Sequence, residues 1–313
     1  MAVAIVKERW TNKVLEMTIG QEPNAVKVGG DSTLPFLHFE GEMPNRPVVA
    51  LEVWDMEPDN WPAILTEPFK GVLDNPVAWA KKCADYGADM ICLRLNSAHP
   101  DQMDATPDEV AATVKAVAEA VSLPLIVVGC GVEEKDALIL PAAGEAISGQ
   151  NALLGCATIN NYKTITATCM VHGHNIIATS PLDINLAKQL NILINEMNLP
   201  LSRIAMDPLV GALGYGVEYA YSIMERARTG ALNGDKMLAI PMICFVGQET
   251  WKTKEAKTED NEEWGAQARR ALLWEVLTAA SFAQAGGSIF ILRHPESLKL
   301  FNNNIAAMMK QNS

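Results

Sequence analysis

The chain has 313 residues, of which 49% are hydrophobic and 20% are charged, a balance that supports a large core and excludes an intrinsically disordered protein. Twenty-five Lys and Arg against 37 Asp and Glu give a net charge of −12. A protein this acidic lacks the positive surface that binds phosphate backbones or anionic lipid headgroups, so we expect neither nucleic acid nor a membrane among its partners. The length fits one large domain with an extension, or two modest domains.

The six cysteines are spread along the chain, and none forms a Cys-x-x-Cys pair. Most stand in apolar runs, which is typical of small buried side chains in a reducing compartment. Their spacing also argues against an iron–sulfur cluster in this chain, because cluster thiolates come in close runs. Charges at Lys7 and Glu8 follow the start too soon for a signal peptide. We therefore expect a soluble cytoplasmic protein.

Residues 1–47 are expected to form a small β extension. Two short apolar segments, 10–19 and 25–28, predict strands, and the Gly-Gly-Asp-Ser sequence at 29–32 predicts a turn. Residues 41–47 hold two prolines and predict a connector. The extension is interpreted as closing the bottom of the main domain or as reaching a partner.

From residue 48 onward, short apolar runs alternate with amphipathic segments. The runs are nearly continuous in apolar character, as expected for parallel strands that are covered on both faces. The eight predicted strands cover residues 48–55, 89–96, 123–131, 151–159, 175–181, 203–211, 241–250 and 288–295. Between them lie helical patterns, such as the one that begins with a capping box at Thr106 and Glu109.

Eight strand–helix units predict an α/β fold, a (β/α)8 TIM barrel over residues 48–313. A doubly wound parallel sheet is the alternative. It is disfavoured because the glycine-containing segment 129–134 lacks the third glycine of a dinucleotide-binding fingerprint.

In such a barrel, functional groups lie at the carboxyl ends of the strands, which form the upper rim. The polar and aromatic residues expected there are Glu52, Asp55, Arg94, Asn96, Cys130, Thr158, Asn160, Asn161, Thr179, Ser180, Asp207, Gln248, Glu249, Thr250, Trp251, Arg293 and His294. Amides and hydroxyls dominate this set, and no lysine ends a strand, so a Schiff-base aldolase is disfavoured. The set suits hydrogen bonding to a large ligand better than proton transfer.

Histidines do not gather on the rim. His294 is the single histidine expected there, whereas His172 and His174 precede the strand at 175–181 and so belong to the opposite end of the barrel. The sequence therefore gives no support to a His-rich metal site. Two rim loops are long: residues 55–74 hold Trp61 and predict an ordered docking surface, and residues 247–263 predict a mobile, charged loop.

Two short motifs resemble pterin-binding barrels. Asp207-Pro208-Leu209-Val210-Gly211 ends the sixth predicted strand, and Arg293-His294 ends the eighth. Together they are similar to motifs of dihydropteroate synthases and methyltetrahydrofolate methyltransferases. They indicate a superfamily and leave the substrate open.

A longer resemblance includes the N-terminal part of the chain. Residues 28–41, with Gly-Gly-Asp-Ser-Thr-Leu-Pro-Phe at their centre, and then residues 44–47 and 50–55, resemble the small subunit of corrinoid/iron–sulfur proteins. This subunit is also called the delta subunit of acetyl-CoA decarbonylase/synthase, and the similarity covers nearly the whole chain. The resemblance implies a heterodimer in which this chain and a large subunit hold a corrinoid between them.

The same resemblance implies a methyl carrier without catalytic turnover of its own. The corrinoid receives a methyl group from methyltetrahydrofolate on a separate methyltransferase and passes it to acetyl-CoA synthase. No family motif identifies single corrinoid contacts, so the expected contacts rest on strand-end position alone. They are Asp55, Asn96, Cys130, Asn160, Ser180, Asp207, Gln248, Thr250, Trp251 and His294.

Two other functions stay open. A pterin-dependent methyltransferase uses the same barrel, but the 47-residue extension favours the carrier subunit. A barrel enzyme of another class, such as an aldolase or isomerase, is disfavoured by the scarcity of lysine and histidine on the rim.

Overall fold

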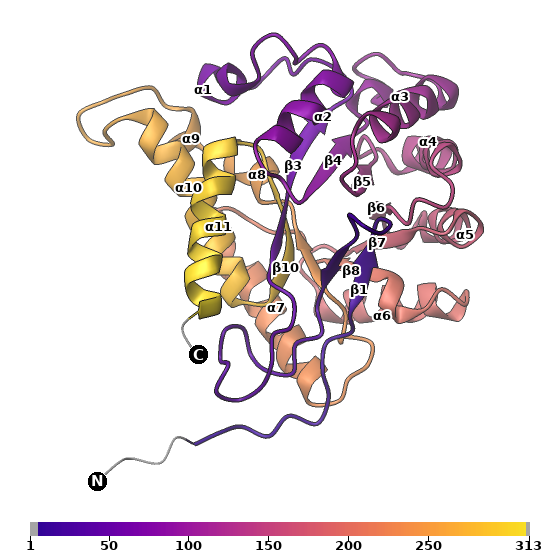
Figure 1. Ribbon diagram of the computed structural model, residues 1–313, viewed down its shortest axis with the longest axis vertical. Helices are drawn as coiled ribbons and strands as arrows, with labels where there is room; N and C mark the ends of the chain where they lie inside the picture. The colour runs from indigo at the N-terminus through magenta and orange to yellow at the C-terminus, as the bar shows by residue number, and fades with distance from the viewer. Residues whose placement is uncertain (1–5, 311–313) are drawn as a thin grey trace.

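The computed structural model describes residues 6–310, and eight parallel strands form a closed barrel at its centre (Figure 1). The strands are β3 (Val48–Trp54), β4 (Met90–Arg94), β5 (Leu125–Val128), β6 (Leu153–Ala157), β7 (Asn175–Thr179), β8 (Ile204–Asp207), β9 (Met242–Cys244) and β10 (Gly287–Leu292). They neighbour one another in chain order, and β10 closes the barrel by pairing with β3. The predicted TIM barrel is confirmed.

Both faces of the strands are apolar because both are covered. In β3, Val48 and Ala50 belong to the core inside the barrel, whereas Val49, Leu51 and Val53 belong to the larger core between the barrel and its helices. This alternation explains why the strand sequences read as continuous hydrophobic runs.

The helices surround the barrel, and several begin at the residues that the sequence indicates. The helical segments are α1 (Ala63–Thr66), η1 (Glu67–Phe69), α2 (Pro76–Asp85), η2 (Asn96–Ala98), α3 (Pro107–Ala120), α4 (Glu133–Ala146), α5 (Tyr162–His172), α6 (Ile184–Glu196), η3 (Leu201–Arg203), α7 (Val217–Leu232), α8 (Val246–Thr250), α9 (Lys254–Lys257), α10 (Gln267–Gln284) and α11 (Pro295–Lys310). The capping box of α3 forms as predicted: Thr106 Oγ1 accepts from Glu109 N, and Glu109 Oε2 accepts from Thr106 N at 2.8 Å.

The residues before β3 close the lower end of the barrel (Figure 1). Strands β1 (Met17–Ile19) and β2 (Val26–Val28) pair antiparallel, and Met17, Ile19 and Val28 are fully buried in the core inside the barrel. The Nδ2 atoms of Asn151 and Asn175 donate to Thr18 O at 2.9 and 3.1 Å and fix this sheet to the strands above it. These contacts place the extension and the barrel strands in one core. They do not test the predicted domain boundary at residue 47, which stays a prediction.

The barrel strands are all shorter than the predicted runs, and two predicted strands differ from the structure in conformation as well. Residues 10–16 are irregular, because their backbone donors bond to loop carbonyls, for example Val14 N to Asp31 O at 2.9 Å. The predicted strand 241–250 ends at Cys244, and α8 follows it within the segment interpreted as strand and mobile loop. A short, fully buried apolar run does not distinguish a strand from a buried helical turn, which explains this error.

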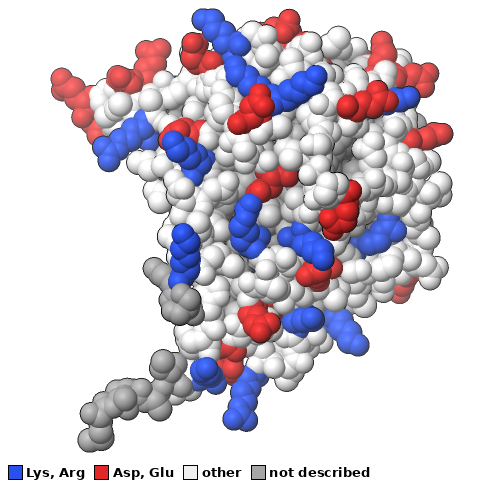
Figure 2. Space-filling model, in the orientation of Figure 1, with Lys and Arg blue, Asp and Glu red and all other residues white. Residues whose placement is uncertain are grey.

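Charged side chains of both signs are interspersed over the face of the molecule that Figure 2 shows. Within residues 6–310, no helix combines the length and apolar character that crossing a bilayer demands. The same residues contain no group of three or more His, Cys, Asp or Glu side chains with metal-binding geometry.

Candidate functional site

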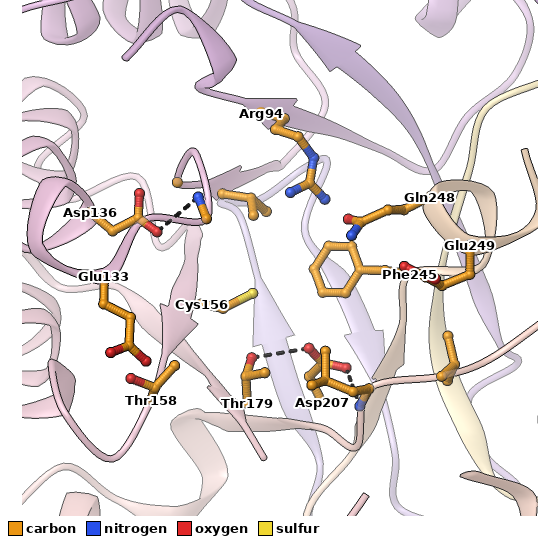
Figure 3. Close-up of a pocket in the computed structure, with 15 residues that line it drawn as sticks. Arg94, Glu133, Asp136, Cys156, Thr158, Thr179, Asp207, Phe245, Gln248 and Glu249 are labelled. Carbon is orange, nitrogen blue, oxygen red and sulfur yellow. Dashed lines mark hydrogen bonds between the residues drawn. The ribbon is translucent and has the colours of Figure 1, made fainter. Parts of the chain in front are cut away.

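The carboxyl ends of the strands surround a central cavity of about 240 Å³ (Figure 3). Its walls come from the ends of β4 to β9 and from the loops and helices that follow them. The lining residues are Arg94, Val128, Gly129, Gly131, Glu133, Asp136, Cys156, Thr158, Thr179, Asp207, Leu209, Val210, Phe245, Gln248 and Glu249. The cavity therefore combines one guanidinium, several carboxyl groups, an amide and hydroxyls in a small volume.

Asp207 is the most buried carboxylate of this cavity, with 1% of its surface exposed. Its Oδ2 accepts a hydrogen bond from Thr179 Oγ1, and its Oδ1 accepts one from Leu209 N, both at 3.0 Å. Burial raises the pKa of Asp207 to about 6, against the opposing effect of these two hydrogen bonds. This carboxyl group consequently changes its charge close to neutral pH.

Arg94 belongs to a buried ion cluster under the rim. Glu52 lies at the centre and accepts from Arg94 Nε at 2.6 Å and from Arg293 Nε at 2.9 Å. Burial alone would raise the pKa of Glu52, but the guanidinium groups of Arg293 and Arg94 hold it well below its ordinary value. Within residues 6–310 the Nη atoms of Arg94 make no hydrogen bond, and Figure 3 shows the Arg94 guanidinium directed into the central cavity. They remain available as donors to a ligand.

A second cavity of about 260 Å³ lies next to the first and shares Arg94, Gly131 and Gln248 with it. Aromatic and basic side chains dominate its walls. The lining residues are Trp54, Asn60, Trp61, Pro62, Arg94, Asn96, Cys130, Gly131, Gln248, Trp251, Lys252, Lys257 and Arg293. The upper end of the barrel therefore has two adjoining polar cavities rather than a single deep pocket.

Asp136 shapes the loop after β5, which borders both cavities. Its two carboxylate oxygens accept from Cys130 N at 2.7 Å and from Gly131 N at 3.1 Å. Gly129 is required beside it, because a Cβ at this position would lie 2.2 Å from Asp136 Oδ1. Asp136 therefore acts on the loop backbone, although it also lines the central cavity.

Comparison with known proteins places the chain in a family. A family model described as CO dehydrogenase/acetyl-CoA synthase delta subunit matches residues 16–305. The chain belongs to this family. The acetyl-CoA decarbonylase/synthase complex subunit delta 1 of Methanosarcina thermophila is 36% identical over 304 residues, which cover 92% of this chain and 69% of that protein. The delta subunit of Methanocaldococcus jannaschii is 34% identical over 287 residues, or 90% of this chain and 69% of that protein.

Solved structures confirm the barrel of this delta-subunit family member. A dihydropteroate synthase of Xanthomonas albilineans matches 88% of this chain and 98% of its own, with a TM-score of 0.58 and 14% sequence identity. The dihydropteroate synthase of Thermus thermophilus matches 88% of this chain and 99% of its own, with a TM-score of 0.56 and 13% identity. At these identities the likeness shows the fold alone. The resemblance to the delta subunits that residues 28–41 carry in the sequence is confirmed by the family match.

Five of the ten residues predicted to contact a cofactor line the two cavities. Asp207 lines the central cavity, Gln248 lines both, and Asn96, Cys130 and Trp251 line the second. They converge although they come from different strand–helix connections. Whether they contact a cofactor stays a prediction.

The other five predicted residues do not line either cavity. Asp55 accepts from Ser97 N at 2.8 Å and from the Ser97 hydroxyl, so its carboxylate holds the loop after β4. Asn160 Nδ2 donates to Glu133 Oε2 at 2.7 Å at the edge of the central cavity. Ser180 and Thr250 are almost completely buried.

His294 lies away from the cavities, in a separate groove against α11. Its ring stacks on Trp251 with 6.1 Å between ring centroids, and its Nδ1 accepts from Glu296 N. Burial lowers its pKa to about 4. His172 and His174 lie at the end of α5 and directly before β7, at the lower end of the barrel as predicted.

Other cavity residues were not among the predicted contacts. Arg94, Thr158 and Thr179 are strand-end residues that the sequence indicates, and the structure directs them into the central cavity. Glu133 and Asp136 lie on α4, and no strand-end rule identifies them. Their signal is the cluster of acidic residues in the first turn of a helix that follows a strand.

The cavity groups are suited to binding rather than to nucleophilic or redox chemistry. Burial raises the pKa of the thiols of Cys130 and Cys156 to about 12, so both are protonated at neutral pH. Arg94, Asn96 and Gln248 supply hydrogen-bond donors and acceptors, and Asp207, with its raised pKa, is the group of the central cavity that can exchange a proton near neutral pH.

Proposed function

We propose that this chain is the subunit that covers and shields a corrinoid in a methyl-carrying heterodimer. A large subunit would hold the cofactor from the other side. Its partners would be a methyltetrahydrofolate methyltransferase, which supplies the methyl group, and acetyl-CoA synthase, which receives it. The chain itself would have no catalytic turnover. Family membership supports this proposal, because the relatives are named as delta subunits of acetyl-CoA decarbonylase/synthase complexes.

The observation that carries the proposal is the chemistry of the upper rim. Arg94, Asn96 and Gln248 present donors that suit the carbonyl groups of amide side arms, and a corrinoid carries several such arms. Cavities of about 240 and 260 Å³ lie below the usual size of pockets for drug-sized ligands. A macrocycle would therefore lie across the rim, with its arms in the cavities.

The residues that line the cavities fit amide arms but do not fit cobalt. The thiols of Cys130 and Cys156 stay protonated, and His294 lies in another groove. When bound, the corrinoid supplies the cobalt that carries the methyl group. Five rim residues would contact the periphery of the corrinoid: Asn96, Cys130, Asp207, Gln248 and Trp251. We propose no iron–sulfur cluster in this chain.

A cytoplasmic location fits the state of the cysteines. All six are free thiols, and four of them are buried. Such a set is typical of proteins in a reducing compartment. We therefore propose that the protein works in the cytoplasm of an anaerobic cell.

One observation favours a second function, a pterin-dependent methyltransferase. The volume of the central cavity suits a bicyclic ring. The cavity also contains a buried carboxyl group, that of Asp207, next to hydroxyl and amide groups. Such a group suits hydrogen bonding to the nitrogens of a pterin ring. The isolated chain should then transfer methyl from methyltetrahydrofolate to free cob(I)alamin, whereas a carrier subunit should not.

The proposed function is tested by anaerobic co-purification. We expect the chain to copurify with a larger, iron-rich subunit and about one cobalt per heterodimer, because a corrinoid held between two subunits would stay with both. Gln248→Ala, which changes both cavities, should reduce the cobalt content to less than about half, since it removes an amide from the shared wall. The measurements are the visible spectrum, the cobalt content and the subunit ratio.

The matched control is His172→Ala, which changes a side chain at the lower end of the barrel, far from both cavities. It should leave the cobalt content unchanged. A colourless preparation without a second subunit would overturn the carrier proposal. Loss of cobalt in the His172 variant would show that the ligand lies at the lower end.

A further inference from the structure

The second cavity is lined by four basic side chains and no acidic one. Arg94 and Arg293 come from the ends of β4 and β10, and Lys252 and Lys257 come from the segment between α8 and the end of α9. This concentration stands out in a chain with a net charge of −12. In contrast, the central cavity contains Glu133, Asp136, Asp207 and Glu249 in addition to Arg94.

The buried part of this positive charge is only half neutralised. Glu52 is fully buried and is the carboxylate that pairs with both Arg94 and Arg293, at 2.6 and 2.9 Å. One carboxylate between two guanidinium groups leaves a formal charge of +1 under the cavity. Glu275 Oε1 also lies nearby, but it accepts from the backbone N of Arg293 at 2.8 Å, and burial raises its pKa.

The two lysines stand at the mouth of the cavity, and their charges are compensated to different degrees. Lys252 pairs with Glu249 at 2.8 Å, and this carboxylate belongs to the central cavity. Within residues 6–310, Lys257 forms no ion pair within 4.0 Å. Its side chain is exposed, so the ammonium group is free to meet an anion from solvent.

The walls contain an unsatisfied donor as well. Trp61 is 9% exposed and lines the cavity, and its indole N–H has no acceptor among the described residues. A buried N–H without an acceptor is costly, so an acceptor from a ligand or from water is expected there. The Arg293 guanidinium lies over the Trp61 ring at 4.9 Å and over the Trp54 ring at 5.5 Å, which fixes its plane beside the opening.

We propose that the second cavity is a binding site for an anionic oxygen group, a phosphate or a carboxylate, at the end of a small-molecule ligand. The guanidinium groups of Arg94 and Arg293 would form its base, the indole N–H of Trp61 would donate from the wall, and Lys252 and Lys257 would close its mouth. Planar guanidinium groups beside an aromatic wall suit the oxygens of such a group. The site overlaps the rim contacts of the proposed function, because Arg94, Asn96, Cys130, Gln248 and Trp251 line the same cavity, but its test with phosphate needs no corrinoid.

Inorganic phosphate is the first probe, because it tests the site without any cofactor. The full chain is titrated with phosphate at constant ionic strength while tryptophan fluorescence is followed, since Trp54, Trp61 and Trp251 all line the cavity. We expect a saturable change. The double variant Lys252→Gln/Lys257→Gln should weaken phosphate binding by about tenfold, since it removes two exposed charges and leaves the buried cluster intact.

Two further variants complete the test. Trp61→Phe keeps the aromatic wall but removes the indole N–H, and it should also weaken phosphate binding. Lys115→Gln, on the outer surface of α3, is the matched control and should leave binding unchanged. A change that does not saturate, or equal binding by the double variant and the Lys115 variant, would overturn the proposal. Neither result bears on corrinoid retention, which is measured by cobalt content.

Competition then identifies the source of the anionic group. Cobalamin contains a phosphodiester that cobinamide lacks, and methyltetrahydrofolate ends in glutamate carboxylates. Displacement of phosphate by cobalamin but not by cobinamide would support a phosphodiester ligand. Displacement by methyltetrahydrofolate would support a carboxylate ligand and would bring the pterin alternative forward.

Discussion

Glu52 and Asp207 are both buried carboxylates under the rim of one barrel, yet their surroundings move their pKa values in opposite directions. Glu52 contacts two guanidinium groups, and the pKa of its carboxyl falls well below its ordinary value. Asp207 has only a hydroxyl and a backbone N–H as partners, and burial raises its pKa to about 6. One carboxylate is therefore charged at every pH except in strong acid, and the other changes its charge near neutral pH.

Asp207→Asn should stabilise the protein at high pH only. The folded state holds the Asp207 proton up to about pH 6, whereas the unfolded state releases it near 3.8, so this contribution to stability is complete below pH 3.8 and is lost as the pH rises through 6. Asparagine keeps an acceptor oxygen at this position without a charge. We compare the free energy of unfolding of the variant with that of the unchanged protein at each pH. This difference should be about 2–3 kcal/mol more favourable to the variant at pH 8 than at pH 4.5.

Urea unfolding of both proteins at pH 4.5 and pH 8 measures this gain. Asp59→Asn, at an exposed position in the loop after β3, should show the same small difference at both pH values. If the Asp207 variant also shows no pH-dependent difference, the carboxyl of Asp207 titrates as it does in the unfolded chain.

Glu52→Gln should be strongly destabilising. It leaves the guanidinium groups of Arg94 and Arg293 buried without a counter-charge, which costs about 3–5 kcal/mol in comparable cases. Because the pKa of Glu52 is lowered, its contribution is fully present above its ordinary value of 4.5 and is lost only in stronger acid. Denaturant unfolding at pH 7 provides the measurement.

Glu67→Gln is the control for this variant. Glu67 pairs with Lys70 at 3.9 Å on the surface, and its loss should change the free energy of unfolding by less than about 1 kcal/mol. Losses of similar size in the two variants would mean that the Glu52 cluster contributes no more than a surface pair.

At the scale of the elements, the extension acts as part of the barrel. Met17 and Ile19 of β1 are fully buried in the same core as Val48 and Ala50 of β3. The barrel is thereby filled from below, and its two cavities lie at the carboxyl ends of the strands. The sequence predicts this role as one of two possibilities for the extension, and the buried side chains of β1 support it.

Met17→Ala should destabilise the whole protein by about 2–5 kcal/mol, since it opens a cavity in a fully buried core. Lys27→Ala, on the paired strand β2 with an exposed side chain, is the control and should have little effect. Thermal unfolding followed by circular dichroism distinguishes the two. A small loss in the Met17 variant would indicate that the extension is loosely attached to the barrel.

The strands could be predicted from the sequence because their signal is local. The barrel strands lie in or at the edge of the predicted apolar runs, as β3 lies within 48–55. The signal failed at Val246–Thr250, where buried residues form α8, because hydrophobicity reports burial rather than backbone conformation.

At the scale of the whole molecule, the site could be predicted only in part. Strand-end position identifies Asn96 and Asp207, because barrel geometry alone brings the carboxyl ends of the strands together, whereas Gln248 lies on α8, beyond the end of β9. It does not show which way a side chain points. Asp55 turns to Ser97, and His294 turns to Trp251, because local hydrogen bonding and stacking decide these orientations.

The contacts of β1 join residues that are far apart in the chain, and this has a consequence for synthesis. Thr18 O accepts from Asn175 Nδ2, across 157 residues of sequence. At the usual rate of translation, about 10–30 s separate the appearance of these two residues at the ribosome. Throughout this interval Met17 and Ile19 have no completed barrel to enter. The side chains of Met17 and Ile19 are therefore buried late, after the strands that enclose them have been synthesised.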